Sequence, residues 1–470
     1  MTVCACLWLG LFPLLQFGTY QTITYNKWTI MLLLVCLTVF CIIGRKPVPE
    51  KRKRKELPPP RPPVTIACTL LFWIVFSNLF SPYGFIVWFF GGTYRMEGFL
   101  SQLCYLGLFF MFASPWVRVS HKPVMISAAA GMLCFLVVVL LQRSGVNALG
   151  LYPAGHSYEN APAFQGTIGN IDMDNGYLCL MAALFLPELI AEISALFREL
   201  RPKKKPSTAP RQPGTWVRAD VQEIKGTVLV RRLLYPLLLL AALLAAVYLV
   251  ITMDVQFGAI TLAFLLLITV LRFIPRARRK WFLLALVVLV LAVVWFWPGQ
   301  SGGIWELKEI LHGRPQLSFG SNRLAVWVYS MRLAPQRLLT GGGSDTFRFR
   351  FNEFIRANGL EIPTEQNGVP LPNSFDTPHN EYVAHLINHG LPAVLLFIAL
   401  IIAAAFFRRR YPKGSKLKPP ADRLNVLSPW AVAVLCYAVQ AFFSFSVPMV
   451  APMFWVTLGI CVGEDTPPEK

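Results

Sequence analysis

Long apolar stretches, separated by short polar ones, fill most of the chain. An α-helix needs roughly 17 to 25 mainly apolar residues to cross a bilayer. Runs of this kind predict twelve membrane-spanning helices, at about residues 3–20, 28–43, 64–81, 99–113, 124–141, 176–197, 233–252, 257–271, 281–297, 391–407, 429–446 and 448–462. Several runs are short, which leaves open that one or two are re-entrant or buried within the bundle. The predicted fold class is an all-α polytopic membrane protein with about twelve transmembrane helices.

The composition agrees with this pattern. Of the 470 residues, 55% are hydrophobic and only 14% are charged, whereas an ordinary soluble domain has about 25% charged residues. A soluble fold could not remove so much apolar surface from water. All ten cysteines lie within the predicted spans, so the sequence implies neither a disulfide framework nor a cysteine metal site.

The net charge of +20 raises the question of nucleic-acid binding, and the distribution of basic residues argues against it. With the N-terminus in the cytoplasm, 33 of the 44 Lys and Arg residues fall in cytoplasmic segments and 11 on the other side. An excess of positive charge on cytoplasmic loops is what orients membrane proteins. We therefore predict that both termini are cytoplasmic. The clusters KRKRK (51–55) and RPKKK (201–205) are interpreted as topology signals that also contact anionic membrane lipids, and no nucleic-acid partner is expected.

One large polar segment, residues 298–390, is predicted to form an extracytoplasmic loop. It divides the chain into residues 1–297 with nine spans, the loop itself, and residues 391–470 with three spans and a cytoplasmic C-terminus. The loop carries eight basic and eight acidic residues, so it is neutral overall.

Two helices are predicted inside this loop. The first has Ser321 as its N-cap and ends before Pro335. The second ends at Gly359, and its apolar face indicates burial against the bundle or, alternatively, a position in the membrane interface; this face is formed by Phe347, Phe351, Phe354 and Ile355. The glycine run TGGGSDTF (340–347) between the two helices is interpreted as a tight turn, because it lacks the Lys-Ser/Thr pair of a phosphate-binding P-loop.

The polar stretch TPHNEYVAHLINHG (377–390) directly precedes an apolar run. Thr377 followed by Pro378 predicts a helix start, and Gly390 predicts its end. His379 would then lie in the first turn, where the helix dipole disfavours the protonated imidazole. A neutral imidazole is what a general base requires, and free N–H groups at a helix start can hold an anion. The stretch therefore has the groups for a general base beside an anion site.

Each candidate residue also has a plain structural explanation. His379 can be a solvated residue at the interface. Arg323, at the start of the first loop helix, is a candidate for phosphate binding because its guanidinium group can contact phosphate oxygens at two points. It can equally form a surface salt bridge. His385 and His389 are four residues apart and could share a metal ion, but without a third ligand they are interpreted as a solvated helix face. No metal site is predicted. The last two candidates, which support either the helix start or an acceptor, are Asn380 and Glu381.

Five segments follow one another along the chain: RMEGF (95–99), QGTIGNIDMDNGYL (165–178), SNRLAVW (321–327), LLTGGGSDTF (338–347) and PHNEYVAHLINHGLPAVL (378–395). In this order they resemble the O-antigen ligase and O-antigen polymerase family of bacterial membrane glycosyltransferases. The resemblance implies a helical bundle related to the C-type glycosyltransferase fold, in the cytoplasmic (inner) membrane. It also implies transfer of a glycan from an undecaprenyl-pyrophosphate carrier to a glycan or lipid-glycan acceptor, outside that membrane and without a metal or other cofactor.

The resemblance assigns roles to individual residues. The histidine of the family's His-Asn pair matches His379, and its loop arginine matches Arg323. Family members often carry Ser-Arg-Gly near the start of the span that precedes the basic turn, whereas this chain has TMDVQFGA (252–259) there. A second phosphate contact is therefore either missing or supplied elsewhere, and Arg95 and Arg348 are the candidates for it.

We therefore predict an inverting, metal-independent glycosyltransferase in which His379 is the general base and Arg323 binds pyrophosphate. Ligase, repeat-unit polymerase and glycan-to-protein transferase remain open within the family. A lipid or polysaccharide transporter without catalysis is the alternative from another class. Transporters concentrate ionisable residues near the bilayer midplane, whereas here the polar groups gather in the outer loop, which favours the enzyme.

Overall fold

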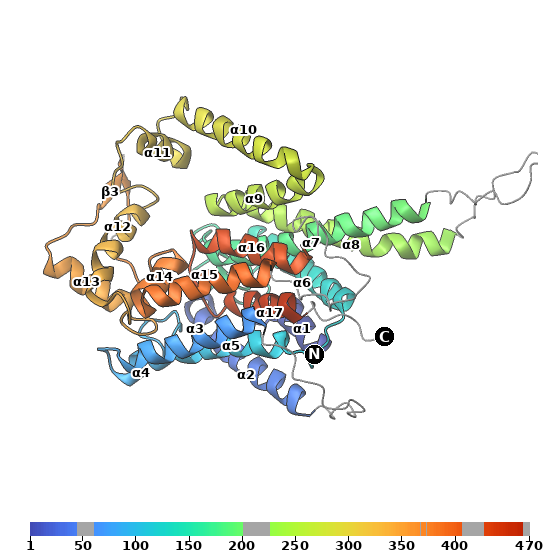
Figure 1. Cartoon of the computed structure of the whole chain (residues 1–470), viewed down its shortest axis with the longest axis horizontal. Coiled ribbons are helices and arrows are strands. Elements are labelled where there is room, and N and C mark those ends of the chain that lie inside the picture. The colour runs from blue at the N-terminus through green and yellow to red at the C-terminus, as the bar shows by residue number, and fades with distance from the viewer. Residues whose placement is uncertain (45–60, 201–225, 367, 373, 407–426, 464–470) are drawn as a thin grey trace, which may run out of the picture.

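A computed structural model of the chain describes residues 1–44, 61–200, 226–366, 368–372, 374–406 and 427–463 (Figure 1). The two basic clusters interpreted above as topology signals, 51–55 and 201–205, lie outside the described residues. The described chain is predominantly helical. Its α-helices are α1 (Thr2–Cys6), α2 (Ile23–Ile43), α3 (Pro62–Leu79), α4 (Phe85–Phe90), α5 (Phe99–Ala113), α6 (His121–Arg143), α7 (Ile171–Leu200), α8 (Gly226–Thr252), α9 (Gln256–Phe273), α10 (Arg276–Trp295), α11 (Gly302–Leu311), α12 (Arg323–Leu333), α13 (Phe347–Ala357), α14 (Glu381–His389), α15 (Leu391–Phe406), α16 (Pro429–Ala441) and α17 (Ala451–Gly463).

Short elements complete the fold. They are a π-helical turn η1 (Leu7–Leu11), the 3₁₀ turns η2 (Tyr20–Thr22) and η3 (Ala334–Arg337), and two antiparallel strand pairs, β1 (Phe164–Gln165) with β2 (Gly169–Asn170) and β3 (Glu365–Gln366) with β4 (Val369–Pro370). In the first pair Phe164 lies opposite Asn170, and in the second Glu365 lies opposite Pro370.

Six described helical segments are long and apolar enough to cross a membrane, judged by length and composition. They are Tyr20–Ile43, Pro62–Leu79, His121–Arg143, Ile171–Leu200, Arg232–Thr252 and Gln256–Phe273. Five shorter apolar helices accompany them: Thr2–Leu11, Phe99–Ala113, Leu391–Phe406, Pro429–Ala441 and Ala451–Gly463. A polytopic helical fold is therefore confirmed at this level, and the number twelve stays a prediction.

The bundle packs around one extended apolar core. α7 lies between α8 and α16, α17 packs against α5, and α15 packs against α3. Fully buried aromatic side chains fill the spaces between these helices, among them Trp8, Tyr105, Phe135, Phe185 and Trp430. By contrast, α10 buries only Val294 of its side chains, and it runs along the outside of the bundle in Figure 1. An apolar helix exposed on nearly all sides is what a lipid environment accommodates.

Lys27 shows how the first helices are tied together inside the bundle. Its side chain is fully buried in α2, and Nζ donates to the carbonyl oxygens of Phe12 and Pro13, each at 2.8 Å. These carbonyls follow η1, where the helix ends and its last oxygens lack intrahelical donors. The ammonium group therefore closes a helix end, which is a structural use of a charge within a membrane segment.

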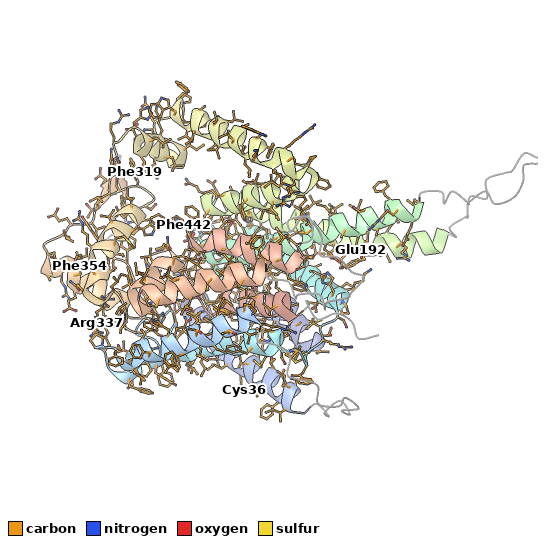
Figure 2. The ribbon with its side chains drawn as sticks, viewed as in Figure 1. Cys36, Glu192, Phe319, Arg337, Phe354 and Phe442 are labelled. Atoms are coloured by element: carbon orange, nitrogen blue, oxygen red, sulfur yellow. The ribbon has the colours of Figure 1, made fainter. Side chains whose placement is uncertain are left out.

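Residues of the large polar segment form a cap with its own small core. Helices α12, α13 and α14 bring together the apolar residues Ala325, Val326, Tyr329, Leu333, Ala334, Phe347, Phe351, Phe375, Val383 and Ile387. The phenylalanine face of the second loop helix is thus buried as predicted, but in the core of the cap instead of against the bundle, and Phe354 and Ile355 pack against this core. Figure 2 marks Phe354 out on α13 and Phe442 at the end of the bundle that faces the cap, where its ring lies 5.3 Å from that of Trp327.

The glycine run joins the cap to the bundle. Gly342 and Gly343 donate their backbone N–H groups to the carbonyls of Ile387 and Asn388, at the end of α14. Gly341 has φ +63°, and a Cβ there would lie 2.4 Å from the backbone of Asn388, so only glycine fits this approach. The end of α3 holds the other side of the turn, through hydrogen bonds from Ser77 to Thr340, from Ser81 to Gly342 and between Asn78 and Ser344. The predicted turn is therefore correct, and it supports α14.

Two predicted helix starts are wrong by a few residues. The first cap helix begins at Arg323 with Asn322 as N-cap, instead of following Ser321. The polar helix begins at Glu381 with Asn380 as N-cap, and the side chain of Asn380 accepts a hydrogen bond from the N–H of Val383 at 3.1 Å. An asparagine at this position caps as well as threonine does. His379 therefore lies outside the helix.

Candidate active site

A cavity of about 460 Å³, called the large cavity below, lies between the cap and the bundle. A volume of this size suits a small-molecule or sugar-sized ligand. Four of the predicted site residues line it, although they come from three distant parts of the chain: Arg95, Arg323, Arg348 and His379. The other lining residues are Tyr94, Asp172, Ser321, Pro372, Ser374, Phe375 and Asp376.

The backbone of His379 adopts an unusual conformation at the edge of this cavity. Its φ of +49° is left-handed, a region that costs a non-glycine residue roughly 1–2 kcal/mol. Neighbouring contacts hold it there. The N–H of His379 donates to Oγ1 of Thr377 at 3.1 Å, and the carbonyl of Pro378 accepts from Nε1 of Trp327 at 2.8 Å. These contacts hold His379 at the wall of the cavity.

The imidazole of His379 lies between two aromatic rings. Phe445 meets it edge-on with centroids 5.0 Å apart, and Phe375 does so at 6.3 Å. Burial among these rings lowers the pKa of His379 to about 3, and the positive charges of Arg323 and Arg95 add to the effect, while Asp376 opposes it. From the sequence, the helix dipole was expected to keep this imidazole neutral. The imidazole is neutral at neutral pH, but the cause is burial together with nearby arginines.

Arg323 opens α12 immediately after three residues in left-handed conformation, Gly320, Ser321 and Asn322. The side-chain amide of Asn322 pins this turn by donating to the carbonyls of Pro363 at 2.6 Å and Pro372 at 2.7 Å. The turn directs Arg323 into the large cavity, where Nη2 lies 3.9 Å from Oδ2 of Asp172 at the start of α7. This ion pair is at the limit of contact, so the guanidinium keeps donors available to a ligand.

Arg95 is engaged more firmly than Arg323. Its Nε and Nη2 donate to the two carboxylate oxygens of Asp376, at 2.8 and 3.2 Å. The guanidinium also stacks over the ring of Phe445, with Cζ 4.2 Å from the centroid. Arg348, from α13, lines the cavity without a side-chain partner among the described residues.

A second, small cavity of about 50 Å³ lies beside the large one. Arg95 and Asp376 line both cavities. The small cavity also contains three carboxyl groups, and burial raises the pKa of Asp345 and of Glu381 to about 7 and that of Glu97 well above its usual value. At this size the space holds only a few water molecules.

Glu381 and the other two histidines of the stretch belong to this small cavity. The predicted solvated face of α14 is therefore wrong: His385 and His389 are buried at 6% and 2% exposure. The glycine run and the end of α3 cover this face, and Nε2 of His389 lies 2.9 Å from Oγ of Ser344. Glu381 is buried as well and accepts from the hydroxyl of Tyr437 at 3.0 Å. Among the described residues, no group of three or more His, Cys, Asp or Glu side chains is arranged to hold a metal ion.

Three residues of the site were missed by sequence reasoning. Asp172 lies within the segment 165–178 that the resemblance singled out, so its position in the motif was a usable signal. Asp376 and Phe445 gave no such signal, because their partners are far away in sequence; Asp376 and Arg95 are 281 residues apart.

Comparison with known proteins finds one family over part of the chain. Residues 239–398 match the family described as O-antigen ligase. The matched segment includes α9 to α14 and thus Arg323, Arg348, Asp376 and His379, whereas Arg95 and Asp172 precede it. No curated protein matches the chain. The match confirms the resemblance to the O-antigen ligase family and, with the apolar helices, supports a multi-pass membrane protein of glycan transfer.

Proposed function

We propose that this chain is an inverting, metal-independent glycosyltransferase at the outer face of the cytoplasmic membrane. It transfers or polymerises a cell-surface glycan from an undecaprenyl-pyrophosphate-linked donor to a glycan or lipid-glycan acceptor. The observation that carries the proposal is the meeting of His379 with three arginines in one cavity of about 460 Å³. A neutral base and a cluster of cations are the two requirements of sugar transfer from a pyrophosphate leaving group.

In this mechanism His379 acts on the acceptor. Its neutral imidazole takes the proton from an acceptor hydroxyl while the oxygen forms a bond to the anomeric carbon of the donor. The bond between that carbon and the pyrophosphate oxygen breaks, and undecaprenyl pyrophosphate leaves with the bonding electrons. A single displacement of this kind inverts the configuration at the anomeric carbon.

The arginines act on the leaving group. A glycosyl pyrophosphate diester carries two negative charges, and the cavity wall carries three arginines against the carboxylates of Asp172 and Asp376. With His379 neutral, the wall has a net charge of +1, which attracts the donor. Arg323 and Arg348 have donors available for phosphate oxygens, and the planar guanidinium group matches them in a two-point contact. Their charge stabilises the additional negative charge that develops as the sugar departs.

Donor binding would also prepare the base. Burial is the largest cause of the low pKa of His379, and the positive charges of Arg323 and Arg95 add to it. A bound pyrophosphate offsets these two positive charges and so raises the pKa of His379, while the contribution of burial remains. The base would therefore be strongest when the donor is present.

The wider architecture is part of the same proposal. We infer twelve spans with both termini cytoplasmic, a fold related to C-type glycosyltransferases, and the cap of residues 298–390 between the spans of residues 1–297 and 391–470. The cap then lies outside the cytoplasmic membrane, where the lipid-linked donor is presented. No cofactor is required, because the pyrophosphate is already an activated leaving group. Ligase, repeat-unit polymerase and glycan-to-protein transferase all use this chemistry.

A transfer assay with purified protein tests the function. Protein in detergent, given a lipid-pyrophosphate-linked glycan and an acceptor, should join the two and release the lipid pyrophosphate, and EDTA should leave the rate unchanged. The control is the same mixture without acceptor. A transporter would bind the donor without forming product, and loss of the rate in EDTA would contradict the metal-independent mechanism.

Reporter fusions test the orientation. Because 33 of the 44 Lys and Arg residues fall on the predicted inner side, a reporter inserted after residue 350 should be extracytoplasmic and one near residue 210 should be cytoplasmic. A periplasm-active and a cytoplasm-active reporter at each position provide the internal control. If both positions are found on the same side, the span arrangement and the placement of the cap are wrong.

A further inference from the structure

Asp376 has no role in the mechanism above, yet it makes the closest charged contact in the large cavity. Its two oxygens bind Nε and Nη2 of Arg95 at 2.8 and 3.2 Å. Both side chains are mostly buried, at 14% and 18% exposure. A two-point ion pair of this kind fixes the plane of a guanidinium group as well as its position.

Phe445 extends this arrangement to the base. Arg95 stacks on the face of the Phe445 ring, with Cζ 4.2 Å from the centroid, and His379 meets the same ring edge-on at 5.0 Å. The ring of Phe445 therefore contacts both the guanidinium of Arg95 and the imidazole of His379. A shift of Arg95 would remove one of the contacts that set the position of this ring.

The pair also separates the two cavities, since Arg95 and Asp376 line both of them. The small cavity holds the carboxyl groups of Glu97, Asp345 and Glu381. For a guanidinium released from Asp376, the oxygens of these three groups are alternative hydrogen-bond acceptors on the side of the small cavity. Nε and Nη2 of Arg95 are engaged, whereas Nη1 has no partner in the described part of the chain.

We propose that Asp376 is a positioning residue of the transfer reaction, which holds Arg95 flat against Phe445 and out of the small cavity, so that Nη1 is available to a phosphate oxygen of the donor. This inference rests on the proposed function. In this proposal Arg95 contacts the pyrophosphate leaving group through Nη1, and Asp376 is needed to keep Arg95 in the position for that contact.

Asp376→Asn separates positioning from binding. The variant keeps the size of the side chain but loses the charge that orients Arg95. We therefore expect kcat to fall about tenfold, which is less than the roughly hundredfold that a 1 Å misplacement of a reacting group can cost. The KM for the donor should change by less than about twofold, because the lost orientation is offset by the removal of a negative charge from the donor site. Asp376→Glu should recover part of kcat, since a carboxylate can still meet the guanidinium edge.

A double-variant cycle identifies Arg95 as the group that is positioned. Once Arg95→Gln is present, adding Asp376→Asn should cost less than about twofold more in kcat, because there is no guanidinium left to orient. Glu365→Gln, on the exposed strand β3 of the cap, is the matched control for loss of one acidic charge and should behave as wild type.

The outcomes separate this inference from the function on which it rests. Two results would overturn the positioning role while the wild type still transfers glycan. One is an unchanged kcat in Asp376→Asn, and the other is that the effects of Arg95→Gln and Asp376→Asn on kcat are fully additive. Loss of folded, monodisperse protein in Asp376→Asn, without recovery in Asp376→Glu, would assign Asp376 to stability and likewise overturn it. Absence of transfer by the wild type would remove the proposed function and this inference together.

Discussion

Replacing His379 with alanine is expected to slow glycan transfer by about a hundred- to ten-thousand-fold, the usual contribution of a general base. The reason is that burial and two neighbouring arginines keep this imidazole neutral at the wall of the large cavity. Without it, no group described in the cavity is placed to take the acceptor proton, since the carboxylates of Asp172 and Asp376 face Arg323 and Arg95. The measurement is the steady-state transfer rate of purified protein.

The left-handed backbone of His379 makes a second variant necessary. Asparagine tolerates a φ of +49° better than alanine does, and it cannot act as a base. His379→Asn should therefore be folded like the wild type and as inactive as His379→Ala. The exposed His156 is the suitable control, because His385 and His389 are buried and their replacement would disturb the packing under the glycine run. Transfer at the wild-type rate in His379→Asn would exclude the base.

Replacing Arg323 is expected to have the next largest effect. Arg323→Lys keeps the charge but loses the two-point contact, so kcat/KM for the donor should fall about ten- to a hundredfold, which corresponds to the roughly 1.5–3 kcal/mol of a hydrogen bond to a charged group. Arg323→Ala should be slower still. Both variants should insert and purify normally, because Arg323 is not part of the apolar core of the cap and its ion pair with Asp172 is long, at 3.9 Å.

Arg332, at the other end of the same helix, provides the control for Arg323. Arg332 is exposed near the end of the same helix, α12, so Arg332→Lys tests the loss of a guanidinium without a change in the cavity. Its kinetics should equal those of the wild type. An unchanged kcat/KM in Arg323→Ala would reduce Arg323 to a surface charge.

The apolar runs predicted the helical bundle because length and hydropathy are local properties of the sequence. The spacing of phenylalanines predicted the buried face of α13 for the same reason. The cap helix starts were harder. Thr377-Pro378 and Asn380 are both good N-cap signals within four residues. In the structure Asn380 is the N-cap, and the hydrogen bond from Trp327 to the carbonyl of Pro378 is a tertiary contact that the local sequence does not reveal.

Some residues of the candidate site could likewise be predicted from the sequence, and others could not. Motif order brought His379 and Arg323 to notice, and the cavity unites them with Arg95 and Arg348. The burial of His385 and His389 could not be foreseen, because the covering turn is stabilised by contacts between α3, the glycine run and α14. The ion pair of Arg95 with Asp376 spans 281 residues, a distance over which sequence pattern carries no information about contact.

The central claim is that His379 activates an acceptor for direct displacement of undecaprenyl pyrophosphate. It is tested most directly by running wild type, His379→Asn and His156→Ala side by side in EDTA, and by measuring acceptor-linked glycan, free lipid pyrophosphate and the anomeric configuration of the new bond. For wild type and His156→Ala we expect one lipid pyrophosphate per glycan transferred, with inverted configuration. For His379→Asn we expect at least a hundredfold slower transfer. Retained configuration in the product, or equal rates for wild type and His379→Asn, would contradict the central claim.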